Sequence, residues 1–354
     1  MSGNAARRPR PPIPVTLVTG PRGGGKTTLV NRLLATLEFA DTAVILNDFG
    51  EVALAGGLVE RAEDGFVALA SGCICCSVRG ALADGLENLV RGLDNGRIAA
   101  IGRVVIEADE AADPAAILSA VERHPYLSLR FAADGIVAVV DATTAEMTLA
   151  GRADTARQVA MADVVALSRG GAVADLIAAI NPWAVVVDAA TAEPGIFTGH
   201  GAFDPAVDDI AAWLKPPRES RATSFAGEAG RIHAFTVARS RTMPVAGADR
   251  FVDYLGALQG PNLIRVRGAV ATGEGETLVI EGFGPYFHPP LIVDRAVTGI
   301  PGTVFAVVAR DLDRGLFEGY LDAFLNEARV DTPDRAALTE NPLAIPGFRA
   351  RGGG

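Results

Sequence analysis

The sequence predicts a doubly wound, mostly parallel α/β domain followed by a smaller α+β domain. The chain has 354 residues, which is more than one domain usually holds. Short Val/Ile-rich runs alternate with helical patterns from residue 14 to about residue 194, as is typical of a parallel sheet covered by helices on both faces. A stretch rich in Gly, Pro and charge then interrupts this pattern over residues 198–230, which favours a linker there.

The same patterns predict boundaries for the domains and their elements. We expect a first domain over residues 14–200, a linker over 201–230, a second domain over 231–328, and poorly ordered tails over 1–13 and 329–354. Nearly continuous apolar runs suit strands that are buried on both faces, whereas apolar residues three or four apart favour helices. The expected strands are residues 15–19, 43–47, 67–70, 103–106, 136–141, 164–168, 185–188, 232–238, 263–270, 277–281 and 303–309. The expected helices are residues 28–37, 78–93, 247–258 and 316–326.

Composition narrows the class of protein and of partner. A hydrophobic fraction of 49% and a charged fraction of 21% exclude a disordered chain. The net charge of −10 disfavours nucleic acid and anionic membranes, because these partners require clustered positive charge. No apolar run approaches the ~18 residues of a membrane span, and the basic, proline-rich start has no apolar segment of the kind found in signal peptides. We therefore expect a cytoplasmic protein, either a monomer or a homodimer.

A phosphate-binding loop is predicted at residues 20–27, which read Gly-Pro-Arg-Gly-Gly-Gly-Lys-Thr. An apolar strand pattern precedes this motif and an amphipathic helix pattern follows it, which is the setting of a P-loop NTPase. The glycines let backbone N–H groups surround phosphate oxygens, the lysine reaches the β- and γ-phosphates, and the threonine hydroxyl ligates Mg²⁺. The alternative is a glycine-rich turn with an incidental lysine. The expected nucleotide-binding residues are Gly20, Gly23, Gly24, Gly25, Lys26, Thr27 and Thr28.

All the cysteines of the chain lie in one short run, Cys73, Cys75 and Cys76. Thiolates at this spacing can converge on one soft or borderline cation, such as Zn²⁺ or Cu(I), and leave a coordination position open for another ligand. An open position suits transfer of a metal better than a permanent structural site. Buried apolar cysteines and a peroxide-sensing thiol pair are the alternatives.

Together these features are similar to those of the CobW-type metallochaperone GTPases, which include cobalamin-biosynthesis proteins, nitrile hydratase activators and zinc chaperones. The resemblance rests first on the P-loop, on Asn-Asp-Phe-Gly-Glu at residues 47–51 and on Gly-Cys-Ile-Cys-Cys at residues 72–76. It extends over nearly the whole chain. The further matching residues are Ile106-Glu107, Asp113-Pro114, Val139-Val140-Asp141-Ala142, Gln158, Ala162-Asp163 and, in the second domain, residues 263–268.

The resemblance implies a nucleotide-dependent metallochaperone. Such a protein binds GTP with Mg²⁺, carries a transition metal, zinc or cobalt, at the cysteines, and delivers the metal to a client metalloprotein. By family position, Asp48 lies near the Mg²⁺ or the transferred metal. Glu107, at the end of its strand, is an Mg²⁺ ligand and a catalytic residue together with Lys26 and Thr27. Coupling requires that the two nucleotide states bind the metal with different affinities.

The chain departs from the family at base recognition and at the γ-phosphate. Where the family has Asn-Lys-x-Asp for guanine, residues 168–171 read Ser-Arg-Gly-Gly. Ser168 and Arg169 then face the base without the aspartate, so ATP is an alternative to GTP. Glu110 replaces a glycine that would approach the γ-phosphate, and Ala55 replaces an acid. These departures indicate weak or lost GTP hydrolysis.

Three functional hypotheses follow. The first is an NTP-hydrolysing metallochaperone with a metal ion and a client protein as partners. The second is a sensor or storage protein that binds nucleotide and metal without turnover. The third, a small-molecule kinase, explains neither the cysteines nor the second domain.

Overall fold

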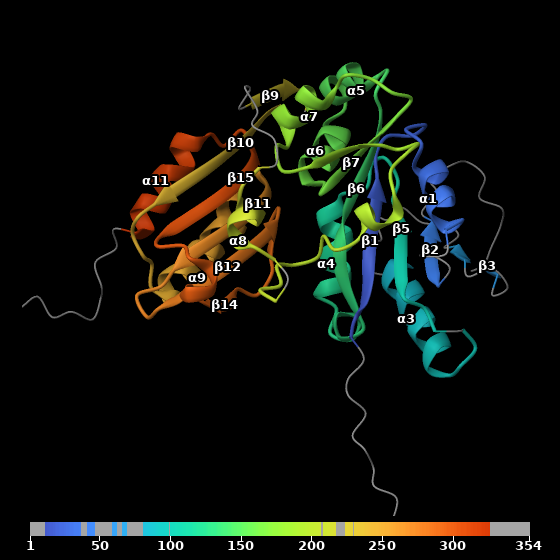
Figure 1. The fold of residues 1–354 in the computed structure, drawn as a ribbon, viewed down its shortest axis with the longest axis horizontal. Helices are drawn as coiled ribbons and strands as arrows, with labels where there is room; N and C mark the ends of the chain where they lie inside the picture. The colour runs from blue at the N-terminus through green and yellow to red at the C-terminus, as the bar shows by residue number, and fades with distance from the viewer. Residues whose placement is uncertain are drawn as a thin grey trace, which may run out of the picture.

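A parallel sheet forms the first half of the molecule, and an antiparallel sheet forms the second half (Figure 1). The computed structural model describes residues 11–36, 41–46, 59–61, 66–68, 81–98, 100–206, 208–216, 224–228 and 230–325. Within these residues the first sheet has the strand order β3-β4-β2-β5-β1-β6-β7-β8. Its strands are β1 (Ile13–Thr19), β2 (Thr42–Leu46), β3 (Val59–Arg61), β4 (Phe66–Ala68), β5 (Arg103–Glu107), β6 (Phe131–Asp141), β7 (Val164–Ser168) and β8 (Val185–Asp188).

The first sheet is parallel except at one edge, where β3 runs antiparallel to β4. Strand β1 lies between β5 and β6 and pairs in parallel with both, so the chain reverses its winding direction around β1. The helices of this half are α1 (Lys26–Leu34), α3 (Ala81–Asp94), α4 (Pro114–Glu122), α5 (Ala145–Gly151), α6 (Ala153–Met161) and α7 (Ala174–Ile180), with short helices at Leu127–Leu129, Pro194–Phe197 and α8 (Ile210–Leu214). Ligands of such open sheets bind outside the carboxyl ends of the strands at the reversal point.

The central strands are apolar because both faces of the sheet are covered. One core cluster packs Leu17, Ile106 and Val140 against helices such as α3 and α6, and a second cluster packs Val18 and Val139 against α1 on the opposite face. All five of these side chains are at most 1% exposed. The predicted doubly wound α/β domain is therefore confirmed.

The second half is an antiparallel sheet covered by helices. Its strand order is β13-β12-β11-β15-β10-β9, and β14 also pairs with β12. The strands are β9 (Ser224–Gly227), β10 (Gly230–Arg239), β11 (Leu263–Ala271), β12 (Glu276–Phe283), β13 (Tyr286–Phe287), β14 (Leu291–Asp294) and β15 (Thr303–Arg310). The helices are α9 (Val245–Tyr254), which continues as a π-helical turn at Leu255–Gln259, α10 (Arg295–Thr298) and α11 (Arg314–Leu325). Helices α9 and α11 cover one face, where Phe251, Phe305 and Phe317 pack edge to face.

The other face of the second sheet packs against the first half of the molecule. Ile232, Ile264 and Val308 belong to the same buried cluster as Val159 of α6 and Ile177 of α7. Helix α8 extends this contact, since its buried Ile210 and Leu214 pack against β11 and β12. The two sheets are thus joined by a continuous apolar interface.

The sequence predicted the long strands better than the short ones. Each strand predicted in the second half is present in β10, β11, β12 and β15. Strand β9, however, lies inside the segment predicted as a linker, and β14 was not predicted. Each of these two strands has four residues, too few for an alternating pattern to be visible. The predicted domain boundaries stay predictions, and most of both predicted tails lies outside the described residues. None of the described helices is long and apolar enough to cross a membrane.

Candidate nucleotide-binding site

The P-loop joins β1 to α1 at the carboxyl end of the first sheet. The residues at the ends of the neighbouring strands, Glu107 of β5, Asp141 of β6 and Ser168 of β7, lie at the same edge. The P-loop therefore lies at the carboxyl end of β1, where the chain reverses its winding direction and where ligands of such sheets bind.

The glycines of the loop are required by the backbone and by close packing on β6. Gly20 has a φ of 134° and Gly25 a φ of 102°, values that other residues rarely adopt. A Cβ on Gly20 would lie 2.2 Å from the carbonyl oxygen of Val139, and one on Gly24 would lie 2.9 Å from the same atom. Gly23 has a φ of 75°, and a Cβ added there would meet no atom within 4 Å. Packing against β6 therefore requires glycine at two positions of the motif, Gly20 and Gly24.

Lys26 is the first residue of α1 and folds back over the loop. Its Nζ donates hydrogen bonds to the carbonyl oxygens of Gly20 at 2.9 Å and Pro21 at 3.2 Å. This arrangement holds the ammonium group above the loop, where a phosphate chain would lie. Among the described residues no side chain caps the N-terminus of α1 at Gly25, and a helix N-terminus of this kind favours an anion. Thr28 is exposed in the same turn.

Thr27 and Glu107 meet at the base of the loop. The Thr27 hydroxyl donates a hydrogen bond of 2.6 Å to Oε1 of Glu107. The Glu107 residue is only 9% exposed, and its Oε2 is buried without a hydrogen-bond partner among the described residues. A buried carboxylate oxygen without a partner is costly unless a cation or donor satisfies it. The hydroxyl and carboxylate are the oxygen ligands that Mg²⁺ prefers, so the residues present fit this ion.

The residues at the predicted base-reading position contact the P-loop directly. Ser168 Oγ donates to the carbonyl of Gly24 at 2.7 Å, and the Arg169 guanidinium donates to the carbonyl of Gly23 at 3.2 Å. Arg169 also forms an ion pair of 2.8 Å with Asp141. Hydrogen bonds from Thr143, with a smaller contribution from the Arg169 charge, hold the pKa of Asp141 below its usual value. The loop after β7 is thereby tied to the phosphate loop.

The position of the guanine-reading aspartate is occupied by a glycine that the backbone requires. Gly171 has a φ of 148°. A Cβ on this residue would lie 2.7 Å from the Cβ of Ala142, closer than packed carbon atoms approach. An aspartate therefore does not fit here without movement of the loop.

The Glu110 carboxylate accepts a hydrogen bond from a backbone N–H of the P-loop. Its Oε2 accepts a hydrogen bond of 2.9 Å from the backbone N–H of Arg22 and forms an ion pair of 3.1 Å with Arg152. The hydrogen bond from Arg152 lowers the pKa of Glu110, and the Lys26 charge acts in the same direction. Arg22 and Arg152 also line a hollow of about 370 Å³ beside the loop. The sequence drew attention to Glu110 but not to Arg152, which lies 42 positions further along the chain.

The metal-binding part of the prediction falls outside the structure's described residues. Cys73, Cys75, Cys76 and Asp48 all lie there. Within the described ranges, no group of three or more His, Cys, Asp or Glu side chains is placed to hold a metal ion. The cysteine site therefore stays a prediction.

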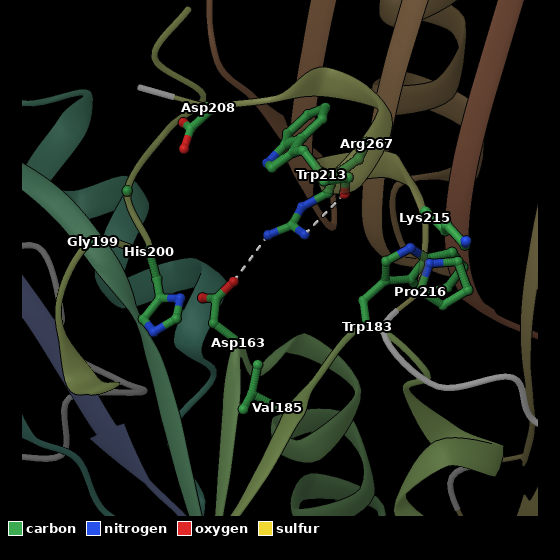
Figure 2. Close-up of a pocket in the computed structure, with 12 residues that line it drawn as sticks. Asp163, Trp183, Val185, Gly199, His200, Asp208, Trp213, Lys215, Pro216 and Arg267 are labelled. Carbon is green, nitrogen blue, oxygen red and sulfur yellow. Dashed lines mark hydrogen bonds and ion pairs between the residues drawn. The ribbon is translucent and has the colours of Figure 1, made fainter. Parts of the chain in front are cut away.

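A second hollow, of about 500 Å³, lies between the two sheets at the opposite, amino end of β7 and β8 (Figure 2). Asp163 accepts a hydrogen bond of 3.0 Å from Arg267, whose guanidinium also lies 5.0 Å from the Trp213 ring centre. Figure 2 shows Lys215 and Trp183 on the other side of the hollow. Because Arg267 of β11 pairs with Asp163 of the first half of the molecule, this hollow is part of the joint between the two sheets.

Comparisons with known proteins agree with this geometry. Residues 14–187 match the CobW/HypB/UreG nucleotide-binding domain model. The chain is 39% identical over 158 residues to the zinc chaperone YjiA of Escherichia coli, a match that covers 45% of this chain and 49% of YjiA. It is 31% identical over 169 residues to the zinc-regulated GTPase metalloprotein activator 1 of Schizosaccharomyces pombe, covering 45% of this chain and 39% of that protein.

A third relative, the zinc chaperone CobW of Pseudomonas aeruginosa, is 32% identical over 138 residues, which cover 36% of this chain and 35% of that protein. The chain thus spans about half the length, or less, of these curated relatives.

A solved structure extends the likeness in fold to both halves of the molecule. The Zn(II)-bound YjiA GTPase from E. coli superposes with a TM-score of 0.69 at 24% sequence identity, over 89% of this chain and 99% of that chain. At this identity the match concerns the fold alone. The family-model match, the P-loop and the Thr27–Glu107 contact lead to one conclusion: residues 14–187 form a domain that matches the CobW/HypB/UreG nucleotide-binding domain.

Proposed function

We propose that this chain is a nucleotide-dependent metallochaperone. It binds GTP with Mg²⁺ at the P-loop, carries Zn²⁺ or Co²⁺ at Cys73, Cys75 and Cys76, and delivers the metal to a client metalloprotein. The observation that supports this most strongly is the contact between Thr27 and Glu107 at the base of an intact P-loop, within a domain of the CobW/HypB/UreG family. The zinc-chaperone names of its relatives support zinc as the cargo.

Each residue of the loop has a role in this proposal. The N–H groups of the loop and of the first turn of α1 bind the phosphates, and Lys26 neutralises their charge. Thr27 and Glu107 hold Mg²⁺, which when bound neutralises the charge that develops on the phosphates. Asp48 is expected beside Mg²⁺ or the transferred metal. Ser168 and Arg169 position the loop on which the base rests, through their hydrogen bonds to Gly24 and Gly23.

The metal site would communicate with the nucleotide through the chain that joins β2 to α3. The cysteines lie between these elements, and β2 is a neighbour of β5, which ends at Glu107. A cation bound by Glu107 would therefore lie at the same end of the sheet as the end of β2, and the cysteines follow β2 in the sequence. The two sites are coupled only if the metal binds the nucleotide states with different affinities.

The test combines calorimetry with a turnover assay. The zinc-loaded and metal-free proteins are titrated with GDP and with non-hydrolysable GTP and ATP analogues, and phosphate release from GTP and ATP is followed in parallel. Lys26→Ala should weaken nucleotide binding at least about tenfold, because hydrogen bonds to charged groups are lost. The chain offers a matched control: Lys215, its only other lysine, is exposed and lines the hollow at the opposite end of the sheet from the P-loop, so Lys215→Ala should bind nucleotide normally.

The metal half of the proposal has its own variant. Cys76→Ser should lower zinc affinity and remove any dependence of nucleotide affinity on zinc, while leaving nucleotide binding to the metal-free protein intact. If the wild-type protein binds zinc with the same affinity as Cys76→Ser, the cysteine site is wrong. If zinc has no effect on nucleotide affinity, the chaperone cycle is wrong even though both ligands bind.

A sensor or storage protein without turnover is the second candidate. Two observations favour it. Glu110 accepts the hydrogen bond of the Arg22 N–H, and Gly171, at the position where the family has an aspartate for guanine, has no room for a larger side chain. Nucleotide binding without phosphate release would support this candidate. Metal-stimulated hydrolysis that Lys26→Ala abolishes would exclude it.

A further inference from the structure

We propose that Glu110 is a specificity-determining residue that disfavours the γ-phosphate, so that the site prefers nucleoside diphosphates to triphosphates. This inference rests on the nucleotide binding proposed above and identifies which nucleotide the resting site selects. It is carried by the position of the Glu110 carboxylate on the P-loop, by the arginine that holds it there, and by the exposure of both side chains.

The carboxylate of Glu110 takes the place of an anionic ligand at one end of the loop. Backbone N–H groups of a P-loop are the donors that bind phosphate oxygens, and the N–H of Arg22 is already used, at 2.9 Å, by Glu110 Oε2. Lys26 and Thr27 lie at the other end of the loop, where α1 begins. A terminal phosphate that extends toward Arg22 therefore meets a carboxylate, whereas phosphates bound at the start of α1 do not.

The Glu110 carboxylate approaches from the same side as the Mg²⁺ ligand. Glu110 follows Glu107 by three residues in the segment after β5. Thr27 and Glu107, which would hold Mg²⁺, lie where the loop faces the end of β5, and Mg²⁺ would there offset the charge of the terminal phosphates. Glu110 reaches the loop from β5 as well, which places the two negative groups next to each other.

The surroundings of Glu110 keep it charged and in position. Arg152, at the start of α6, pairs with its carboxylate at 3.1 Å, and the pKa of Glu110 is lowered mainly by this hydrogen bond. The buried Gln158 side chain, also on α6, donates to the backbone carbonyl of Glu110 at 3.0 Å. Helix α6 thus fixes both the main chain and the side chain of this residue.

The ion pair is nevertheless open to displacement. The Arg152 and Glu110 side chains are 42% and 27% exposed, and exposed pairs of this kind contribute little to stability. A triphosphate can therefore bind, but it must displace the carboxylate from the Arg22 N–H and remain close to it. Because Arg152 both holds the carboxylate in place and partly offsets its charge, substitutions of Glu110 itself are the direct test.

The experiment compares the affinities of Mg·GDP and a Mg·GTP analogue in the full chain by calorimetry. Glu110→Gln and Glu110→Ala should raise the affinity for the triphosphate relative to the diphosphate by about ten- to a hundredfold. Glu274→Gln, an exposed acid in the β11–β12 turn, is the control for loss of one negative charge and should leave the ratio unchanged. Thermal melts establish that each variant is folded.

The outcomes separate this inference from the proposed function. A triphosphate-to-diphosphate ratio that is the same in wild type and both Glu110 variants overturns the role of Glu110 and leaves nucleotide binding intact. Triphosphate binding that appears only in the Glu110 variants supports it. If the folded wild type and all the variants bind no nucleotide, the proposed function fails, and this inference fails with it.

Discussion

Asp163→Asn should weaken the joint between the two sheets and lower the free energy of unfolding by about 3 kcal/mol. Asp163 Oδ1 lies 2.6 Å from Arg265 Nη2 and 3.0 Å from Arg267 Nη2, both on β11. Glu281 on β12 is the second acid of this group, 3.1 Å from Arg265. Two arginines and two acids therefore form a neutral cluster in which Asp163 is the contribution of the first half of the molecule.

The magnitude follows from the burial of the cluster. The side chains of Asp163, Arg265 and Glu281 are 4%, 5% and 6% exposed. Asparagine would leave two buried guanidinium groups facing one carboxylate, and an uncompensated buried charge costs about 3–5 kcal/mol. Its carbonyl oxygen can still accept the hydrogen bond that Asp163 Oδ2 receives from the Ile136 N–H at 3.0 Å, which favours the lower end of this range.

Tryptophan fluorescence provides a local readout of this joint during urea denaturation. The only two tryptophans, Trp183 and Trp213, both line the hollow beside Asp163 (Figure 2). Trp183 Nε1 donates to the carbonyl of Leu214 at 2.9 Å, so the two rings report on the same region. The midpoint of the transition should fall for Asp163→Asn and stay unchanged for the exposed control Glu274→Gln.

The dependence on pH gives a second test of the same reasoning. Burial opposes ionisation of Asp163, but the charges of Arg265 and Arg267 outweigh it and lower the pKa of Asp163 from 3.8. A lowered pKa contributes stability that is present above pH 3.8 and is lost as the pH falls through the folded-state value. The difference between wild type and Asp163→Asn should therefore be full at pH 7 and shrink below about pH 4. A loss below about 1 kcal/mol at neutral pH, or one that persists undiminished in acid, would refute this account.

Three further predictions concern the nucleotide site. Gly20→Ala should lower the melting temperature and abolish nucleotide binding, since its Cβ would lie 2.2 Å from a carbonyl oxygen of β6. Gly23→Ala, which has open space around it, should cost only the roughly 1–2 kcal/mol of a left-handed backbone. Equal melting temperatures for the two variants would contradict this difference. Thr27→Ala should remove the effect of Mg²⁺ on nucleotide affinity in calorimetry and also lower stability, because it removes the hydrogen bond to the buried Glu107 carboxylate; an undiminished Mg²⁺ effect would exclude Thr27 as a ligand. Gly171→Asp should destabilise the protein without raising the preference for GTP over ATP, and a gain in GTP preference would show that the loop can adapt.

Most of the long strands and four of the helices were predicted from their patterns, whereas α4 and α6, nine residues each, were not. Strands β1, β5, β7 and the second half of β6, residues 136–140, are buried and rich in apolar residues, whereas the first half of β6, which contains Asp134 and Gly135, was not predicted. Short edge strands escaped prediction for a physical reason. Strand β9 is defined by its register with β10 across the turn between them, and its four residues carry too little pattern to reveal it.

The candidate site was predictable where its residues are contiguous. The P-loop is a local motif, and the structure brings Lys26, Thr27 and Glu107 to one edge of the sheet. The Arg152–Glu110 pair and the Asp163–Arg267 pair join residues 42 and 104 positions apart. No local pattern indicates such contacts, because they depend on how α6 packs between the two sheets. Sequence reasoning therefore identified the loop, Glu107 and Glu110, but not the arginine that pairs with Glu110.

The loop after β7 explains why guanine preference cannot be restored by one substitution. Arg169 has a φ of 63° and Gly171 a φ of 148°, so the chain turns sharply at both positions. The turn is held by the hydrogen bonds of Ser168 and Arg169 to the P-loop, and it brings Gly171 against Ala142. An aspartate would need a different backbone, and that change would break the contacts that support the phosphate loop. In the proposed site, the packing of Gly171 against Ala142 therefore leaves no room for an aspartate, and we expect any choice between GTP and ATP to come from other contacts.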